Sequence, residues 1–532
     1  MEGSFDYVIV GAGSAGCAVA ARLSEDRSVR VLLLEAGGKD RSPNIKIPAA
    51  FPKQFKTKLD WDYSTGPEPG LDGRELYVPR GKSLGGSSSM NAMMYVRGRP
   101  LDYDGWRESG CPGWGYEDVL PYFKRAENNE RGPSEVHGAG GPLNVADQRS
   151  PRPLTRRFLE AAQAAGIPAN PDINSPEQDG VSMTQVTQRN GRRWSCADAY
   201  LRPAMKRPNL TVRTGAQVLG IVFEGERAAG IRWRDSRGRE AIARTAREVV
   251  LSAGAIGSPQ ILMVSGIGPA GHLGESGISV RVDLPGVGEN LQDHPYVLLN
   301  YEATEPESLA DAEKPKALLE WAMRRSGPLT SNVGEAMAFI RTRPGLPAAD
   351  VQLLFGPAYF HDHGFDTYED HAFVLGAVLV SPRARGRLRL RSPDPLAKPH
   401  LVGNHLSEPE DLASMVAGFR RLREIAATEP LASVRGAELI PGEDVETDEE
   451  IEAFLRRETE LLYHPVGTCR MGSDEAAVVD PELRVRGVEG LRVADASVMP
   501  VITGGNTHAP TVMIGERAAD LIAGATAQTA VA

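Results

Sequence analysis

Residues 7–16 read YVIVGAGSAG and place an apolar run directly before Gly11, Gly13 and Gly16. The run predicts a buried strand, and the glycines are typical of a turn from a strand into a helix that contacts a pyrophosphate. Gly11 permits the tight turn, Gly13 removes the Cβ that would block a phosphate, and Gly16 lets the helix pack against the strand. The N-terminus of that helix then presents free N–H donors to the phosphates.

The residues that follow continue the same unit. A helical stretch at 14–25 leads to a second apolar run at 29–34, which ends in Glu35. An acid at this place accepts a hydrogen bond from a ribose hydroxyl. A glycine turn alone is weak evidence, but strand, helix, strand and acid together predict a dinucleotide-binding unit.

Size and composition fit a large globular protein with small-molecule partners. The 532 residues are 41% hydrophobic and can form about three domains, or two large interleaved ones. A net charge of -10 disfavours a nucleic-acid partner, which would need a basic face. Four cysteines without a CxxC pair predict neither a disulfide framework nor a zinc site. No apolar run reaches the roughly 18 residues that span a bilayer and no signal-type segment is present, so we expect a cytoplasmic protein.

The middle of the chain has a different pattern. Between about Tyr301 and Glu458 the signals of the dinucleotide-binding unit vanish, and alternating runs at 372–380 and 386–390 predict an antiparallel sheet. This region is the expected substrate half.

Further motifs occur on both sides of that region. Two more glycine-rich loops lie at 80–91 (RGKSLGGSSSMN) and 254–268 (GAIGSPQILMVSGIG), and each offers backbone N–H groups to an extended ligand. The C-terminal part contains YHPVGTCRMG at 463–472 and GGNTHAPTVMIGERAAD at 504–520. Together with the N-terminal unit, these stretches resemble the glucose–methanol–choline (GMC) family of FAD oxidoreductases. In appearance the chain is most similar to the bacterial primary-alcohol dehydrogenases of that family.

The resemblance implies an α/β fold of two domains. One is a Rossmann-like FAD-binding domain, which is interleaved with a substrate domain built on an antiparallel sheet with helices. We place the FAD-binding domain at residues 1–155, 208–298 and 459–532, and the substrate-binding domain at 156–207 and 299–458.

The resemblance also implies which residues contact FAD. The three glycines of the first turn would lie at the pyrophosphate, Glu35 at the adenosine ribose and Val218 beside the adenine. Ordinary core packing is the alternative for Val218 and Ala92. The other expected cofactor contacts are Ser14, Ala15, Ala36, Arg80, Ser83, Gly86, Ser87, Asn91, Ala92, Asp495, Ala496, Thr507, Pro510 and Thr511.

Covalent flavin and a metal are both disfavoured. In several family members a histidine directly before the asparagine of the first glycine-rich loop attaches the flavin, whereas this chain has Met90 there. A thioether cannot make that linkage, so we expect non-covalent FAD. The segment His361–His371 mixes three histidines with three aspartates, but its spacing matches no common closed metal site. We expect a solvated or gating loop and no metal.

Two histidines in the C-terminal motifs are the candidate catalytic residues. His464 and His508 stand 44 residues apart, as the resemblance requires of the catalytic pair, although a structural histidine remains the alternative for each. An alcohol cannot give up a hydride until its hydroxyl proton is leaving, so a base is needed at that oxygen. We assign this role to His464, and His508 would hold the oxygen in position. The expected substrate contacts are Met93, Tyr296 and Tyr463.

Substrate and acceptor are less defined by sequence. Choline-oxidising members would place a glutamate after the His-Pro of GENLQDHP, where this chain has Tyr296. A neutral primary alcohol is therefore favoured, with electrons passing to a quinone or dye-type acceptor or to O2. His508 replaces the asparagine usual in the similar dehydrogenases, and a His–His pair is typical of sugar and aryl-alcohol oxidases that produce H2O2. A hydroxynitrile-lyase-type flavoprotein without net redox and a non-catalytic flavin protein are the alternatives from other classes. The oligomeric state stays open.

Residues 383–391, RARGRLRLR, alternate arginine with apolar or small residues and predict a strand with its arginines on one face. We expect a solvated edge strand. An anionic membrane surface or an acidic acceptor is the alternative, and this is the one hint in the sequence of a peripheral membrane contact.

Overall fold

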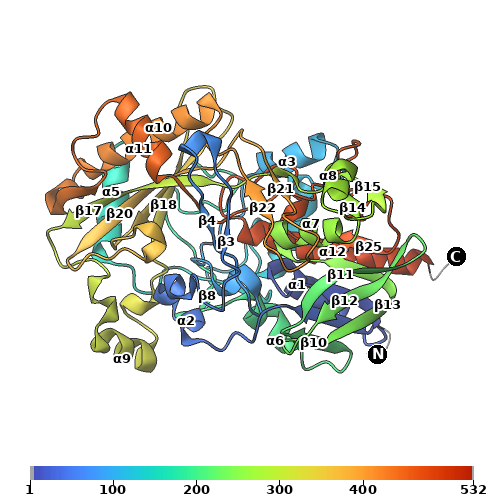
Figure 1. Ribbon diagram of the computed structural model, residues 1–532. Helices are drawn as coiled ribbons and strands as arrows, with labels where there is room; N and C mark the ends of the chain where they lie inside the picture. Colours follow the sequence, from blue (N-terminus) through green and yellow to red (C-terminus); the bar gives the residue numbers. More distant parts are fainter. Residues whose placement is uncertain (1–4, 530–532) are drawn as a thin grey trace.

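Two seven-stranded sheets organise the chain in a computed structural model, which describes residues 5–529 (Figure 1). The first sheet contains the N-terminal strand and has the order β10-β2-β1-β13-β12-β11, with β25 also paired to β13. Its strands are β1 (Phe5–Val10), β2 (Val31–Glu35), β10 (Leu210–Thr214), β11 (Gln217–Glu224), β12 (Arg227–Arg234), β13 (Glu240–Leu251) and β25 (Leu491–Val493). The pairs among β10, β2, β1, β13 and β25 are parallel, whereas β11, β12 and β13 form an antiparallel meander.

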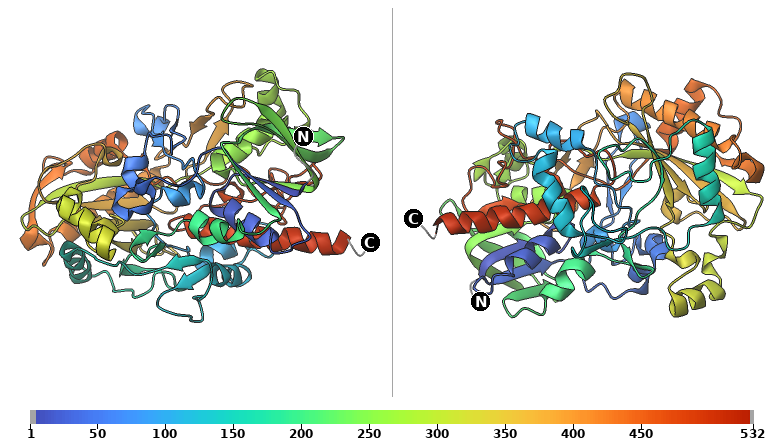
Figure 2. Two further views of the ribbon diagram at one scale, coloured as in Figure 1. Left: turned by 90° about the horizontal axis from the view of Figure 1, so that it is seen from below. Right: turned by 180° about the vertical axis from the view of Figure 1, so that it is seen from behind.

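The centre of this sheet explains the apolar runs at the N-terminus. Val8 pairs with Leu32 and Ile9 with Leu33, and all four side chains are fully buried. Parallel strands that are covered on both faces are apolar without alternation. The chain leaves β1 through residues 11–13 and enters α1 (Ser14–Leu23), which packs along the C-terminal helix α12 (His508–Thr529), as Figure 2 shows.

All strand pairs of the second sheet are antiparallel, and the sheet lies beside the first (Figures 1 and 2). Its order is β23-β17-β20-β19-β18-β7, with β24 also paired to β17. The strands are β7 (Gly180–Met183), β17 (Pro295–Ala303), β18 (Ala336–Ile340), β19 (Val351–Gly356), β20 (Ala372–Leu379), β23 (Arg435–Ile440) and β24 (Glu460–Leu461). Mixed α/β content with an antiparallel second sheet confirms the expected fold class.

Alternation along β20 shows how this sheet serves two purposes. Val374 and Gly376 line a large cavity, whereas Ala377 lies 3.1 Å from where a Cβ on Gly418 of α10 (Pro409–Ala426) would stand. Successive strand residues point to opposite faces. One face of the sheet therefore packs on α10, and the other forms a wall of the cavity.

The remaining elements surround these two sheets. The longer helices are α3 (Pro100–Glu108), α4 (Tyr116–Ala126), α5 (Pro153–Ala164), α7 (Gly254–Val264), α9 (Pro315–Arg324) and α11 (Asp448–Glu458). The shorter ones are α2 (Pro43–Lys46), α6 (Arg202–Ala204) and α8 (Ala270–Glu275). Within residues 5–529, no helix has both the length and the apolar character needed to cross a membrane.

Two details differ from the sequence expectations or leave them as predictions. The strand at 386–389 (β21) lies outside the second sheet and is the central strand of a three-stranded sheet with β16 (Glu289–Leu291) and β22 (His400–Val402). The expectation of an edge strand was wrong. Alternation with a period of two indicates which face of a strand is exposed to solvent, but it does not indicate how many strands pair with it. The domain boundaries stay a prediction: β17 crosses the boundary at 298/299, and β24, placed with the FAD-binding domain, pairs with β17.

Candidate active site

A cavity of about 500 Å³ runs between the two sheets, and residues from both line it. Most of the predicted site residues meet there, from the first glycine turn to the C-terminal motifs. Those that line the cavity are Gly11, Gly13, Ser14, Ala15, Glu35, Ala36, Arg80, Gly86, Ser87, Asn91, Ala92, Met93, Val218, Tyr296, Tyr463, His464, Asp495, Ala496, Thr507, His508 and Thr511.

Three predicted cofactor contacts are absent from the lining of this cavity. A Cβ on Gly16 would stand 1.9 Å from the carbonyl oxygen of Gly11, so this glycine allows helix and strand to pack. The buried Ser83 hydroxyl donates to the carbonyl of Leu84, and Pro510 is buried in the first turn of α12. Sequence spacing located these residues near the site but did not show which way each one points.

The glycine turn fits an anionic ligand. Gly11 has a φ of +97°, and a Cβ there would lie 2.4 Å from the carbonyl oxygen of Ser252. In contrast, a Cβ on Gly13 would meet no atom within 4 Å, because Gly13 faces the cavity. Helices α1, α7 and α12 all begin at residues that line the cavity, so their N–H ends face it. This cradle suits the pyrophosphate of a dinucleotide.

Glu35 and Asp495 are the two acids that line the cavity, and backbone groups hold both. Glu35 accepts from the N–H of Ala12 at 2.9 Å and of Gly37 at 2.7 Å, and its burial raises the pKa to about 7. Asp495 accepts from the N–H of Gly254 at 2.9 Å and from Ser497, which ties its loop to the start of α7. The Glu35 carboxylate has lone pairs left beyond these two bonds, whereas Asp495 holds the backbone of two loops in place.

His464 is held by three neighbours at the other end of the cavity. Its backbone N–H donates to Asp293 Oδ1 at 2.7 Å. In its ring, Nδ1 lies 3.0 Å from Nδ1 of His294, and Nε2 lies 3.4 Å from the side-chain nitrogen of Asn506. Burial, His294 and the Arg80 guanidinium hold the pKa of His464 well below its usual value. The ring is therefore neutral at pH 7.

The contacts of His464 also define its tautomer. The side-chain nitrogen of Asn506 can only donate, so Nε2 of His464 is assigned as the acceptor and the proton to Nδ1, which donates to His294. Burial and Arg99 lower the pKa of His294 to about 3, so that ring is also neutral. His464 thus presents a basic Nε2 at the cavity.

His508 joins two helix starts. Its Nδ1 lies 3.1 Å from Oγ of Ser14, so the first residues of α12 and α1 are in contact. Its Nε2 is buried and has no hydrogen-bond partner in the structure. Burial and Arg193 lower its pKa to about 4. A buried polar atom without a partner on a cavity wall indicates a ligand atom that completes it.

The substrate end of the cavity is apolar. Its rings and aliphatic side chains belong to two small clusters at the second sheet and the residues around it. They include Phe51, Phe55, Met90, Met94, Leu298, Val333, Leu354, Phe360 and Leu462, together with Tyr296 and Tyr463, and Val374 of β20 lines the same cavity. Because Glu35 and Asp495 lie on the side of the first sheet, no acid of residues 5–529 lines this end.

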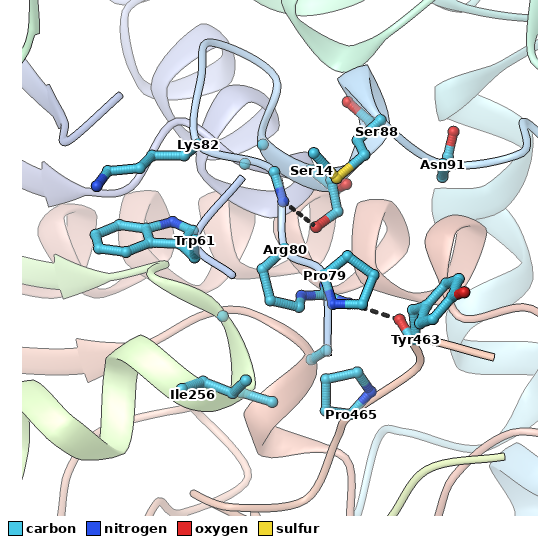
Figure 3. A pocket seen from close by; sticks show the side chains of 18 of the residues that line it. Ser14, Trp61, Pro79, Arg80, Lys82, Ser88, Asn91, Ile256, Tyr463 and Pro465 are labelled. Atoms are coloured by element: carbon cyan, nitrogen blue, oxygen red, sulfur yellow. Dashed lines mark hydrogen bonds between the residues drawn. The ribbon is translucent and has the colours of Figure 1, made fainter. Parts of the chain in front are cut away.

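The histidine-rich segment contacts this wall from outside. Nδ1 of His363 lies 2.6 Å from the hydroxyl of Tyr463, and both residues have a positive φ, +58° and +65°. Arg80 Nη1 donates to the Tyr463 carbonyl at 2.5 Å, a bond drawn in Figure 3. Two unfavourable backbone conformations persist only where surrounding contacts hold them. Within the described part of the chain, no group of three potential ligands could hold a metal ion.

Sequence reasoning missed three residues of this site. His294, Asn506 and His363 all lie inside motifs that were singled out, and their polar character was the available signal. Their partners are far away in the chain, so only the fold reveals the contacts.

The comparisons with known proteins agree with this geometry. Two family models, both described as GMC oxidoreductase, match residues 5–296 and 382–515. The chain belongs to the GMC oxidoreductase family; it is an oxidoreductase and FAD is its cofactor.

Three relatives illustrate the family. An uncharacterised GMC-type oxidoreductase of Mycobacterium tuberculosis is 51% identical over 98% of this chain and 100% of its own length. The oxygen-dependent choline dehydrogenase of Brucella ovis is 45% identical over 98% of this chain and 96% of its own. The crystal structure of pyridoxine 4-oxidase from Mesorbium loti is 34% identical, covers 97% of this chain and 99% of its own, and superposes with a TM-score of 0.89.

Proposed function

We propose that the protein oxidises a neutral primary alcohol to an aldehyde. The observation that carries this proposal is a neutral, half-buried His464 on an apolar cavity end that no acid of the described residues lines. An apolar wall desolvates the hydroxyl and strengthens its bond to the base.

Each polar residue of this end has a proposed role. Nε2 of His464 accepts the hydroxyl proton of the alcohol, and Nε2–H of His508 donates to the same oxygen. When bound, FAD supplies the acceptor for the hydride that leaves the carbinol carbon. Met93, Tyr296 and Tyr463 contact the substrate.

The proposed cofactor contacts are those of the first sheet and the glycine-rich loops. Gly11 and Gly13 face the pyrophosphate, Glu35 the ribose and Val218 the adenine. FAD is proposed to be non-covalent because Met90, buried among Phe51 and Phe55, offers no nucleophile for attachment. Acid precipitation should therefore release yellow flavin into the supernatant and leave a colourless pellet.

Choline is the second candidate substrate. A relative of 45% identity is a choline dehydrogenase, and the rings of Phe51, Phe55 and Phe360 are able to stack on a quaternary ammonium. We favour the neutral alcohol because no carboxylate lines the same wall to balance a cation. The proposed acceptor is a quinone or dye, with O2 as the alternative.

An anaerobic stopped-flow screen separates these candidates. The FAD-loaded protein is mixed with aliphatic alcohols, aromatic alcohols and choline, and flavin bleaching is followed. We expect neutral primary alcohols to bleach the flavin rapidly. If choline reduces the flavin faster than all of these alcohols, choline becomes the favoured substrate. Subsequent addition of air, quinone or dye identifies the acceptor.

The variant His464→Ala tests the proposed base. We expect flavin reduction to slow by about 10²–10⁴-fold while FAD stays bound. An unchanged reduction rate would remove His464 from the mechanism. Failure of every alcohol to bleach wild-type flavin would instead favour a non-redox activity.

A further inference from the structure

Exposed apolar side chains gather on one short helix of the substrate half. Leu318, Leu319 and Met323 of α9 are 52%, 60% and 75% exposed, and Met323 is the most exposed large apolar residue of the described chain. Ala317 and Trp321 on the opposite side of the helix are buried, and the Trp321 indole donates to the Gly191 carbonyl at 2.9 Å. The helix is therefore anchored by one face while its other, apolar face meets water.

Exposed cations without a carboxylate partner in residues 5–529 lie on α9 and on the hairpin that contacts its buried side, and they form the cationic rim of this helix. Lys316 and Arg324 lie on α9, and Arg192 lies on the hairpin of β8 (Gln188–Arg189) and β9 (Arg192–Arg193) that binds Trp321. All three are exposed, and none has a carboxylate partner among the described residues. The chain as a whole carries a net charge of -10. A cationic rim on an acidic protein is a local feature that needs an explanation.

Two of the carboxylates near α9 are already paired with lysines. Asp311 pairs with Lys314 at 2.6 Å, and Glu313 pairs with Lys53 at 2.6 Å. Glu320 of α9 accepts from the Ser326 hydroxyl at 3.0 Å and keeps its charge, so it offsets one of the three cations and leaves the rim net positive.

The surface adjoins the substrate end of the cavity. Lys53 belongs to η1 (Pro48–Gln54), whose Phe51 lines the cavity, and η1 contacts η6 (Pro328–Thr330), which follows α9. Figure 1 shows α9 at the lower left, on the side of the second sheet and away from the labelled N-terminus.

The arginine-rich stretch at 383–391 is a weaker candidate for the same role. Arg383 pairs with Glu410 at 3.0 Å, Arg389 pairs with Glu289, and Arg385 donates to three backbone carbonyls. Leu388 of β21 is fully buried, so this stretch offers no apolar face.

We propose that the exposed face of α9 docks on an anionic lipid membrane. Leu318, Leu319 and Met323 enter the interface, and the surrounding cations pair with lipid phosphates. An apolar helix face with a cationic rim is the feature that binds anionic bilayers in the interfacial plane. Docking places the substrate end of the cavity beside a phase in which apolar alcohols and quinones concentrate. The inference does not depend on which alcohol is oxidised.

Vesicle co-sedimentation of the FAD-loaded full chain tests this proposal. Vesicles of phosphatidylcholine are compared with vesicles that contain roughly one-third phosphatidylglycerol, at low and high salt. We expect binding to the anionic vesicles to be at least about tenfold stronger and to weaken with salt. Absence of binding to the anionic vesicles would overturn the proposal.

Matched variants locate the contact. Leu319→Ser with Met323→Ser, and separately Lys316→Gln with Arg324→Gln, should each abolish most binding while the flavin spectrum and alcohol oxidation in solution stay unchanged. Val280→Ser, at a 45% exposed position between α8 and β15 (Val282–Asp283), and Arg387→Gln in the arginine-rich stretch are the controls and should bind like wild type. Figure 1 shows α8 and β15 on the opposite side of the molecule from α9. Binding that survives both α9 variants, or that is lost in Arg387→Gln, would refute the assignment. Light scattering tests the alternative of a second copy: a wild-type dimer that the α9 variants dissociate, with no vesicle binding, would mean that this face binds another copy of the chain. That result would also refute membrane docking.

Discussion

The two ends of the cavity are built from different parts of the chain. The cofactor end is made mainly of backbone: glycine turns, three helix starts, and acids such as Glu35 that backbone N–H groups hold. The substrate end is made of side chains, with rings and aliphatic groups around His464 and His508. A backbone site recognises the shape and charge shared by all dinucleotides, whereas a side-chain site sets the chemistry and the choice of alcohol.

The electrostatics of the two ends differ in the same way. Burial raises the pKa of Glu35 to about 7 at the cofactor end and lowers the pKa of His508 to about 4 at the substrate end. Both shifts favour the neutral form, because a low-dielectric cavity penalises charge. The comparison predicts distinct failures when each end is changed.

The largest effect is expected for Gly13→Ala at the cofactor end. A Cβ at this position meets no protein atom within 4 Å, so the fold should persist, but the methyl group would occupy the space of the pyrophosphate. We expect nearly complete loss of FAD, measured as flavin absorbance per protein, with unchanged far-UV circular dichroism. Gly274→Ala in α8, which also meets no atom within 4 Å, is the control and should keep its flavin. Full flavin content in Gly13→Ala would show that the pyrophosphate lies elsewhere.

At the substrate end, His508→Ala should leave FAD bound and slow anaerobic flavin reduction by about 10²–10³-fold, the usual cost of one lost donor to a developing oxyanion. His508→Asn should recover a large part of that loss, since an amide also donates. Equal rates for wild type and His508→Ala would assign the unpartnered Nε2 a purely structural role.

His294→Ala removes the acceptor that keeps the His464 proton on Nδ1. We expect flavin reduction to slow by about tenfold, a fraction of the effect of removing the base itself. His294→Asn keeps an acceptor and should be milder. A rate loss as large as that of His464→Ala would mean that His294 itself takes the proton.

Tyr463→Phe and His363→Ala each break the bond that holds the Tyr463 ring. We expect a several-fold shift in the ratio of kcat/KM between bulky and small alcohols, because the wall becomes less rigid. Flavin content is the control, since the change lies at the substrate end. Parallel losses for all alcohols would argue against a role of this bond in selectivity.

The smallest effect concerns acid stability. Burial lowers the pKa of His363 and His508 to about 4, below the value of about 6.5 in the unfolded chain. The unfolded state therefore binds protons first, and stability that is present above pH 6.5 is lost as the pH falls toward 4. Each such histidine contributes up to about 1.4 kcal/mol per pH unit in this window. The unfolding temperature of wild type should fall more steeply with decreasing pH below pH 6.5, and that of His363→Ala should fall less steeply. Identical slopes of unfolding temperature against pH would contradict the assignment.

Residues 7–35 illustrate what local sequence determines. Apolar runs, glycine spacing and a terminal acid are enough for the strand, turn, helix and strand, because glycine conformation and strand burial are short-range properties. The motifs around His464 and His508 likewise predicted that both belong to one site, and both line the same cavity.

Tertiary structure decided the remainder. The contact of His464 with His294 spans 170 residues, that of His363 with Tyr463 spans 100, and that of Ser14 with His508 spans 494. The central place of β21 and the exposed apolar face of α9 likewise depend on which distant segments cover them. Local patterns encode backbone conformation, whereas the tautomer of a base, the charge state of a buried ring and the exposure of a helix face depend on neighbours brought together by folding.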